Sequence, residues 1–170
     1  MTAMGRAGGV PYETIVRMAE WAVERGGGVL VTLGLGSCVA IMLHDPGPPL
    51  GAMAHILLPS RSLARDGSNP AKFPETAVPF LVERLLAAGG ARSRLVAKLA
   101  GGASMFAQLM TPGTLQMGER NVVAARDALR RAGIPLVGEA VGGARGRSVR
   151  FHVLDGHVEI RSVGADATRL

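Results

Sequence analysis

The sequence predicts an α+β protein: a single-domain β-sandwich of mixed sheets with helices packed on the outside. Apolar residues make up 48% of the 170 positions and charged residues 19%, a balance that suits a chain of this length burying one core. Short β-branched runs outnumber helical patterns, and most of them follow one another along the chain. This order favours mixed sheets over a strictly alternating parallel sheet.

The first part of the chain contains a lead-in followed by strands. No repeat or low-complexity linker divides the sequence, so residues 1–170 are expected to form one domain. The first 20 or so residues are expected to be a flexible lead-in. The segment YETIVRMAEWAVERGGG looks like a short amphipathic stretch that ends in glycines, where a helix cannot persist cheaply. Strands are then predicted at 29–33, 39–43 and 52–59.

The second part contains two predicted helices. The segments 75–90 and 118–133 repeat apolar residues at helical spacing and end at glycines. Asn121 is expected to cap the second helix. The polar stretch between the third strand and the first helix is expected to be an exposed loop. A strand over 94–105 and closing strands with an Asp-Gly hairpin turn complete the pattern.

Charge and cysteine usage narrow the possible functions. The net charge of +6 comes from scattered arginines, and aromatic residues amount to only 4%, so nucleic-acid binding is not expected because bases would find few rings to stack on. The positive surface suits an acidic protein partner. A single cysteine favours a reducing compartment. The start shows no secretory signal and no run could span a membrane, so a cytoplasmic protein without membrane insertion is expected.

The only cysteine, Cys38, is followed across a proline-rich loop by His55. If the hairpin turn is centred between Pro46 and Gly47, these two residues lie opposite each other, with Cβ atoms roughly 4.5–5.5 Å apart. That separation allows a thiol–imidazole hydrogen bond, from which a nucleophilic thiolate forms. A one-residue slip of the register would place the two side chains on opposite faces.

Neighbouring residues suit the same chemistry. Thr32 is the nearest hydroxyl on the preceding strand and can orient the imidazole. Gly36 and Ser37 leave an open backbone whose N–H groups can face an oxyanion. The four histidines and one cysteine lack metal-ligand spacing, so neither a metal nor another cofactor is expected. The plain alternative is that Cys38 and His55 are ordinary core side chains.

Several segments resemble the CheD-type chemoreceptor glutamine deamidases. TLGLGSCVA resembles the family's T-x-x-x-G-S-C-V-A pattern, and AHILLP resembles A-H-x-x-L-P. Further along, AKLAGGASMF, MGERNV and VGGARGRSVRF resemble three more segments of the family. The resemblance covers a deamidase-like core of roughly residues 29–161, and LARDGSNPAKFPETAV departs from it.

The resemblance implies a site made of Cys38, His55 and Thr32 on a β-sandwich flanked by helices. It also implies conversion of glutamine to glutamate on the cytoplasmic helical domains of chemoreceptors, through a cysteine thioester and without a cofactor. Proteins of this type often also bind a CheC-type phosphatase. Two alternatives stay open: a non-catalytic module that regulates such a phosphatase or receptor, and another Cys–His amide hydrolase.

Overall fold

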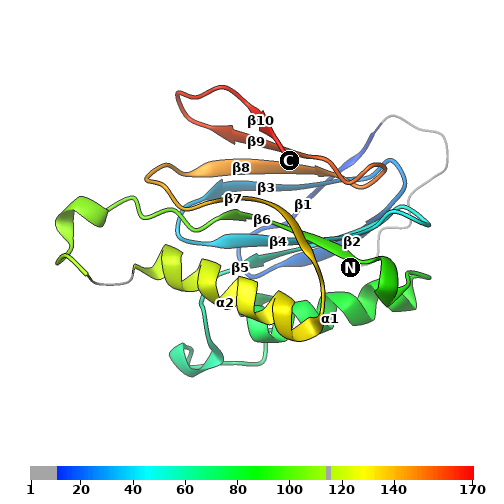
Figure 1. Ribbon diagram of the computed structural model, residues 1–170, viewed down its shortest axis with the longest axis horizontal. Coiled ribbons are helices and arrows are strands. Elements are labelled where there is room, and N and C mark those ends of the chain that lie inside the picture. The colour runs from blue at the N-terminus through cyan, green and yellow to red at the C-terminus, as the bar shows by residue number, and fades with distance from the viewer. Residues whose placement is uncertain (1–10, 114–115) are drawn as a thin grey trace.

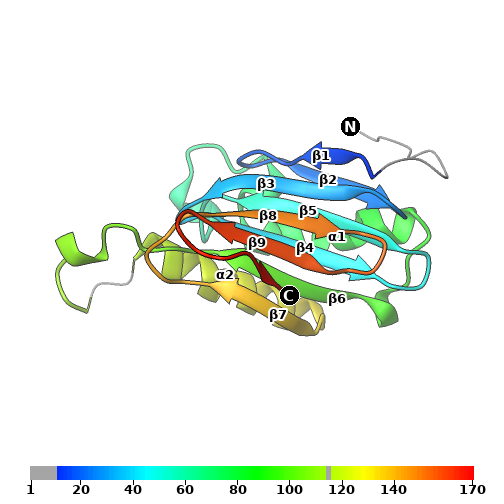
Figure 2. The ribbon, with the colours of Figure 1, turned by 90° about the horizontal axis from the view of Figure 1, so that it is seen from above.

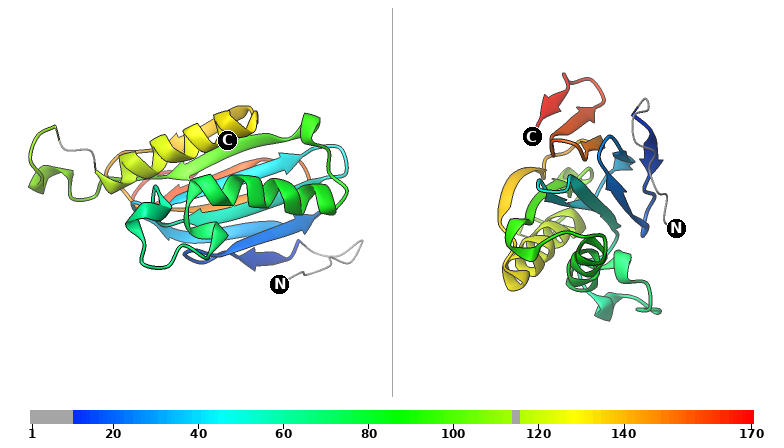
Figure 3. Two further views of the ribbon diagram at one scale, coloured as in Figure 1. Left: turned by 90° about the horizontal axis from the view of Figure 1, so that it is seen from below. Right: turned by 90° about the vertical axis from the view of Figure 1, so that its right-hand side faces the viewer.

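In the part of the chain that the structure describes, two five-stranded sheets stack face to face, and two α-helices cover the free face of one of them (Figure 1). The computed structural model describes residues 11–113 and 116–170. The predicted α+β sandwich with helices on the outside is confirmed, although the helices cover one side only, as the end view in Figure 3 shows. Within the described ranges, no helix has both the length and the hydropathy needed to cross a bilayer.

The sheet that faces away from the helices is called the outer sheet. Its strands in spatial order are β1 (Glu13–Ile15), β3 (Val29–Leu35), β8 (Arg147–His152), β9 (Val158–Ser162) and β10 (Thr168–Arg169). Only β1 and β3 run parallel in it. The predicted hairpin turn at Asp155–Gly156 lies between β8 and β9, which run side by side in Figure 2.

The second sheet, called the inner sheet, lies between the outer sheet and the helices. Its strands in spatial order are β2 (Trp21–Arg25), β5 (Leu50–Ile56), β4 (Val39–Asp45), β6 (Val96–Gly101) and β7 (Leu136–Val141). Every residue of β4 and β5 is buried. Both faces of these central strands are covered, which explains why their sequences are nearly continuous apolar runs.

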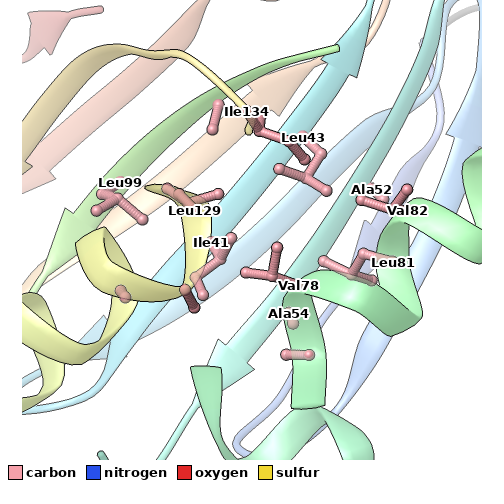
Figure 4. Packing of buried hydrophobic residues seen from close by; sticks show 14 of the residues in the cluster. Ile41, Leu43, Ala52, Ala54, Val78, Leu81, Val82, Leu99, Leu129 and Ile134 are labelled. Atoms are coloured by element: carbon pink, nitrogen blue, oxygen red, sulfur yellow. The ribbon is translucent and has the colours of Figure 1, made fainter. Parts of the chain in front are cut away.

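The two predicted helices are confirmed as α1 (Pro74–Ala87) and α2 (Met117–Ala132). Proline at the first position of α1 suits a helix start, and Gly133, with φ of +70°, ends α2. Figure 4 shows Val78 and Leu81 of α1 and Leu129 of α2 in one buried cluster with Ile41 of β4. This core packs the two helices against the inner sheet.

Two predictions about local structure are wrong. The amphipathic lead-in forms β1 and β2, because β2 pairs with β5 along its whole length and tertiary pairing overrides helical patterning; residues 1–10 lie outside the described part. The stretch before α1 is not simply an exposed loop. Ala71 and Phe73 in it are fully buried, and Lys72 accepts hydrogen bonds from the N–H groups of Leu57 and Leu58.

A buried carboxylate closes the end of the β4–β5 hairpin. Asp45, at 0% exposure, accepts hydrogen bonds from Arg94 Nε at 2.7 Å and Nη2 at 2.9 Å. It also accepts from the N–H groups of Gly47 and Ala91. Chiefly because of the Arg94 hydrogen bond, the pKa of Asp45 falls to about 2.

Replacing this carboxylate tests its contribution to stability. Asp45→Asn should lower the free energy of unfolding at neutral pH by about 1–2 kcal/mol, allowing for solvent screening at the half-exposed Arg94. A pKa lowered on folding from 3.8 to about 2 stabilises the native state above about pH 4, and this stabilisation is lost as the pH falls toward about 2. Urea unfolding at several pH values should therefore show the gap narrowing in acid. A gap independent of pH, or an equal loss in the exposed control Asp166→Asn, would contradict this.

Candidate active site

A hydrogen bond joins the two sheets inside the core. Thr32 comes from β3 of the outer sheet and His55 from β5 of the inner sheet, and they are 1% and 4% exposed. Thr32 Oγ1 lies 2.8 Å from His55 Nδ1. The structure thus brings together two of the three side chains singled out in the sequence.

The direction of this hydrogen bond follows from the next one. The Thr32 hydroxyl donates its hydrogen to the carbonyl oxygen of Val16 at 2.7 Å. A hydroxyl has one hydrogen, so Thr32 Oγ1 must accept from His55, and the imidazole proton sits on Nδ1. His55 Nε2 then carries the lone pair, is buried, and has no hydrogen-bond partner in the described part of the chain.

The surroundings keep the His55 ring neutral. Burial lowers the pKa of His55, and the Val16 carbonyl and Glu20 oppose this shift. The backbone of His55 is fixed as well: its N–H donates to Glu20 O at 3.0 Å, and its carbonyl accepts from Ala19 N–H at 2.9 Å. His55 is therefore a rigidly held imidazole whose Nε2 is available as a base.

Cys38 lies beside His55 but not directly opposite it. The β4–β5 ladder pairs Ala40 with His55, so the predicted direct pairing of Cys38 with His55 is wrong by two residues. The shift arises because the predicted register would place two turn prolines within the ladder, where they cannot donate hydrogen bonds. An even shift keeps Cys38 on the same face as His55, as a diagonal neighbour roughly 7–8 Å away in Cα position.

The thiol is buried and protonated in the resting protein. Cys38 is 7% exposed and packs in the core between the sheets. Burial raises the pKa of the Cys38 thiol, and its own backbone N–H acts in the opposite direction. The predicted thiol–imidazole hydrogen bond is absent, since Nε2 of His55 has no partner among the described residues. The site thus holds a neutral thiol next to a neutral base.

Beside the sulfur, the backbone carbonyls have hydrogen-bond partners and the backbone N–H groups do not have backbone acceptors among the described residues. The carbonyls of Gly36, Ser37 and Cys38 all accept hydrogen bonds: from Ala103 N–H, from Asn121 and from Gly102 N–H. By contrast, within residues 11–113 and 116–170, the N–H groups of Ser37 and Cys38 donate to no backbone carbonyl. Free N–H groups next to a nucleophile are the donors that a developing oxyanion requires.

Asn121 was expected to cap the second helix, and this prediction is wrong. Helix α2 begins at Met117, with Gln116 as its N-cap, so Asn121 lies inside it and is fully buried. Its Nδ2 donates to Ser37 O at 2.8 Å and to Leu57 O at 3.2 Å. It therefore links the segment of Cys38 to the segment that follows His55. An asparagine on the apolar face of an amphipathic helix was the available signal, because a buried amide needs partners.

Glycines allow both β6 and α2 to come this close to the segment of Cys38. A Cβ on Gly101 would lie 2.3 Å from the carbonyl oxygen of Cys38, and its φ of +109° also disfavours a side chain. A Cβ on Gly118 would lie 2.6 Å from the carbonyl oxygen of Gly102. The start of α2 thus packs directly on the backbone that supports Cys38.

An exposed apolar segment begins next to this backbone. Phe106 is 66% exposed and Leu109 is 83% exposed, and Met105 and Met110 are about half exposed. We call residues 105–110 the apolar loop; Figure 1 shows it reaching beyond the ends of the sheets. The Met105 methyl lies 3.1 Å from where a Cβ on Gly36 would be, so the apolar loop starts at the site itself.

The chain is similar to one protein family and to members of it. The family model described as CheD chemotactic sensory transduction matches residues 57–162. A probable chemoreceptor glutamine deamidase CheD of Moorella thermoacetica is 46% identical over 159 residues, covering 91% of this chain and 93% of the relative. The chemoreceptor glutamine deamidase CheD of Thermotoga maritima is 44% identical over 150 residues, covering 88% and 92%.

A solved structure is similar at a lower level. The crystal structure of the hypothetical protein YfiH of Bacillus licheniformis matches with a TM-score of 0.45 and 14% identity, covering 71% of this chain and 49% of that chain. This likeness is too weak to support a conclusion about fold or function.

The protonation state of Cys38 predicts its reactivity. Alkylation by iodoacetamide should be slow near neutral pH, because only the thiolate reacts, and its pH midpoint should lie above the ordinary value of 9.0. His55→Gln should leave that midpoint nearly unchanged, since no hydrogen bond joins the two groups. A midpoint below that of the urea-unfolded chain would instead reveal a preformed thiolate–imidazolium pair and contradict the neutral resting state.

The linking role of Asn121 can be tested by stability. Asn121→Leu leaves the carbonyls of Ser37 and Leu57 without this donor and should lower the free energy of unfolding by about 1–3 kcal/mol. Asn121→Asp should cost at least as much at neutral pH and recover in acid, because a protonated carboxyl can again donate. The exposed neighbour Arg120→Leu should change stability by less than about 0.5 kcal/mol. Equal urea midpoints for Asn121→Leu and the parent protein would contradict the role.

Proposed function

This chain belongs to the CheD family, and from that premise we infer that it is a chemoreceptor glutamine deamidase, which hydrolyses glutamine side chains of receptors to glutamate. The observation that carries this conclusion is the match to relatives of that name over 88–91% of the chain at 41–46% identity. The geometry around the only cysteine supplies the chemistry.

In the proposed mechanism, Cys38 is the nucleophile and His55 is the base. As the sulfur bonds to the carboxamide carbon, the thiol proton passes to the free Nε2 of His55. The carbonyl oxygen becomes an oxyanion that accepts hydrogen bonds from backbone N–H groups of the segment Gly36–Ser37–Cys38. Thr32 accepts from Nδ1 throughout, which holds the ring and stabilises its positive charge.

The remaining steps return the site to its starting state. The protonated Nε2 gives its proton to the leaving nitrogen, the C–N bond breaks, and ammonia departs from a thioester on Cys38. Nε2 then removes a proton from water, whose oxygen attacks the thioester carbon. The C–S bond breaks, the sulfur takes back a proton, and a glutamate side chain is released. This sequence of steps uses neither a metal nor another cofactor.

The surface near the site supports a helical, partly acidic substrate. A groove at the outer face of α2 is lined by Arg120, Val123 and Arg130, with Pro59 from the segment that follows β5. The apolar loop starts beside Gly36. We propose that these surfaces receive the cytoplasmic helical domains of chemoreceptors, which places the protein in the cytoplasm. A CheC-type phosphatase is a further proposed partner of the same surfaces.

The hydrogen bond of Thr32 to Val16 supports a proposal about domain organisation. We propose that residues 1–170 act as one domain whose predicted core, 29–161, is completed by the preceding segment. Val16 supplies the carbonyl that accepts the Thr32 hydrogen bond. The lead-in is therefore part of the site's support.

Mass spectrometry of a co-expressed receptor cytoplasmic domain tests the proposed function. Specific glutamines should gain about one dalton, the change from amide to acid through a thioester, and Cys38→Ala and His55→Ala should abolish this gain. Thr32→Val should slow it about 10-fold or more, whereas Thr32→Ser, which keeps the hydroxyl, should stay close to the parent rate.

Two outcomes would contradict this function. Full conversion by Cys38→Ala would point to a non-catalytic binding module. Comparable turnover of free small amides would indicate a different Cys–His hydrolase, because a receptor deamidase needs its structured helical substrate.

A further inference from the structure

Two histidines and a glutamate converge on the exposed face of the β8–β9 hairpin. His152 ends β8, His157 precedes β9, and Glu159 lies two residues further along. His152 pairs with Val29 at the start of β3, whereas Leu35, at the other end of that strand, leads to Cys38. The cluster is therefore at the opposite end of the outer sheet from the proposed active site (Figure 2).

The potential ligand atoms lie close together. Glu159 Oε1 is 3.2 Å from His152 Nε2 and 3.7 Å from His157 Nε2, and one ligand atom of each residue lies within 4.8 Å of the others. Ligands bound at about 2.0–2.1 Å in a tetrahedral zinc site lie roughly 3.4 Å apart. The two nitrogen–oxygen separations are thus near those that one metal ion requires.

A fourth residue sets the orientation of one ring. Asp155 Oδ1 lies 2.6 Å from His157 Nδ1, so Nδ1 carries the proton and Nε2 is left with its lone pair. A carboxylate that binds the outer nitrogen of a histidine is the usual support of a metal-binding imidazole. Arg169 lies 3.6 Å from the other oxygen of Asp155, which holds this carboxylate in place.

The second ring has an unsatisfied nitrogen. His152 Nε2 is buried and has no hydrogen-bond partner among the described residues, although Glu159 is close. The two rings stack with centroids 4.0 Å apart and an angle of 10° between their planes. Their side chains are 26% and 20% exposed, so the rings can tilt to aim both lone pairs at one point. A bound cation would satisfy the orphaned nitrogen.

We propose that His152, His157 and Glu159 form a binding site for a borderline divalent cation such as Zn²⁺, with water completing the coordination. Two imidazoles and one carboxylate select such an ion over Mg²⁺ or Ca²⁺, which prefer oxygen ligands. The ion would fasten β9 to β8 at the end of the outer sheet. The spacing of the histidines in the sequence does not indicate this site, because the β8–β9 hairpin turn is what brings the two rings together.

Titration of the untagged, metal-free protein with ZnCl₂ in a calorimeter tests this site. One ion should bind per chain, and His152→Ala and His157→Ala should each weaken binding at least 10-fold. Asp155→Asn should weaken it about 10-fold through the supporting hydrogen bond. Two matched controls should bind like the parent: Arg161→Ala, on the same strand, and Cys38→Ala, which removes the only thiol.

The thermal midpoint provides a second readout. Zn²⁺ should raise the unfolding temperature of the parent protein and of Cys38→Ala, but not that of His157→Ala. The site would be disproved by the absence of one-site binding in the parent protein, or by binding that survives in His152→Ala and His157→Ala but disappears in Cys38→Ala.

Discussion

The hydrogen bond between Thr32 and His55 is the interaction on which the proposed chemistry depends. It crosses the interface of the two sheets, and the Thr32 hydroxyl donates its own hydrogen bond to Val16 O. Val16 is in turn held by its N–H bond to Val31 O at 2.7 Å. Buried hydrogen bonds of this kind polarise one another. The packing of the sandwich therefore determines which nitrogen of His55 is free, so fold stability and the ring's tautomer are set by the same contacts.

The other side of the site depends on close backbone approach. Gly102 and Gly118 lack the atoms that would keep α2 away from the segment behind Cys38, and Gly101 lets β6 approach the Cys38 carbonyl. Only at that distance can Asn121 reach two carbonyls from different segments. The carbonyls of Ser37 and Leu57 are thus occupied, whereas in the described part of the chain the N–H groups of Ser37 and Cys38 donate to no backbone carbonyl. The segments around Cys38, Gly101 and Asn121 are far apart in the sequence, and they meet beside Cys38 because the glycines leave room for close backbone contact.

Periodicity and turn chemistry in the sequence were enough to predict α1, α2 and the strands around Cys38. Thr32 and His55 also meet, as expected from the family resemblance and from Thr32 being the nearest hydroxyl on the preceding strand. The hairpin register was not predictable from a turn centre alone, because the prolines decide where the ladder can resume. The strands β1 and β2 have weak local patterns and form through pairing with distant strands. Asn121 could be placed only once the packing of α2 was known.

A buried neutral thiol and a buried neutral imidazole suit a nucleophile that must wait for its substrate. Moving the thiol proton to His55 would create two charges at buried positions, and such charges are costly unless each has a partner. Thr32 accepts from the imidazolium, but among the described residues the thiolate would have only that imidazolium and its own backbone N–H as partners. In the proposed mechanism, the negative charge gains a further donor once it has moved to an oxyanion near the N–H groups of Ser37 and Cys38. The proposed proton transfer and attack are therefore coupled, and an electrophile that does not place its oxygen there is expected to leave the thiol protonated.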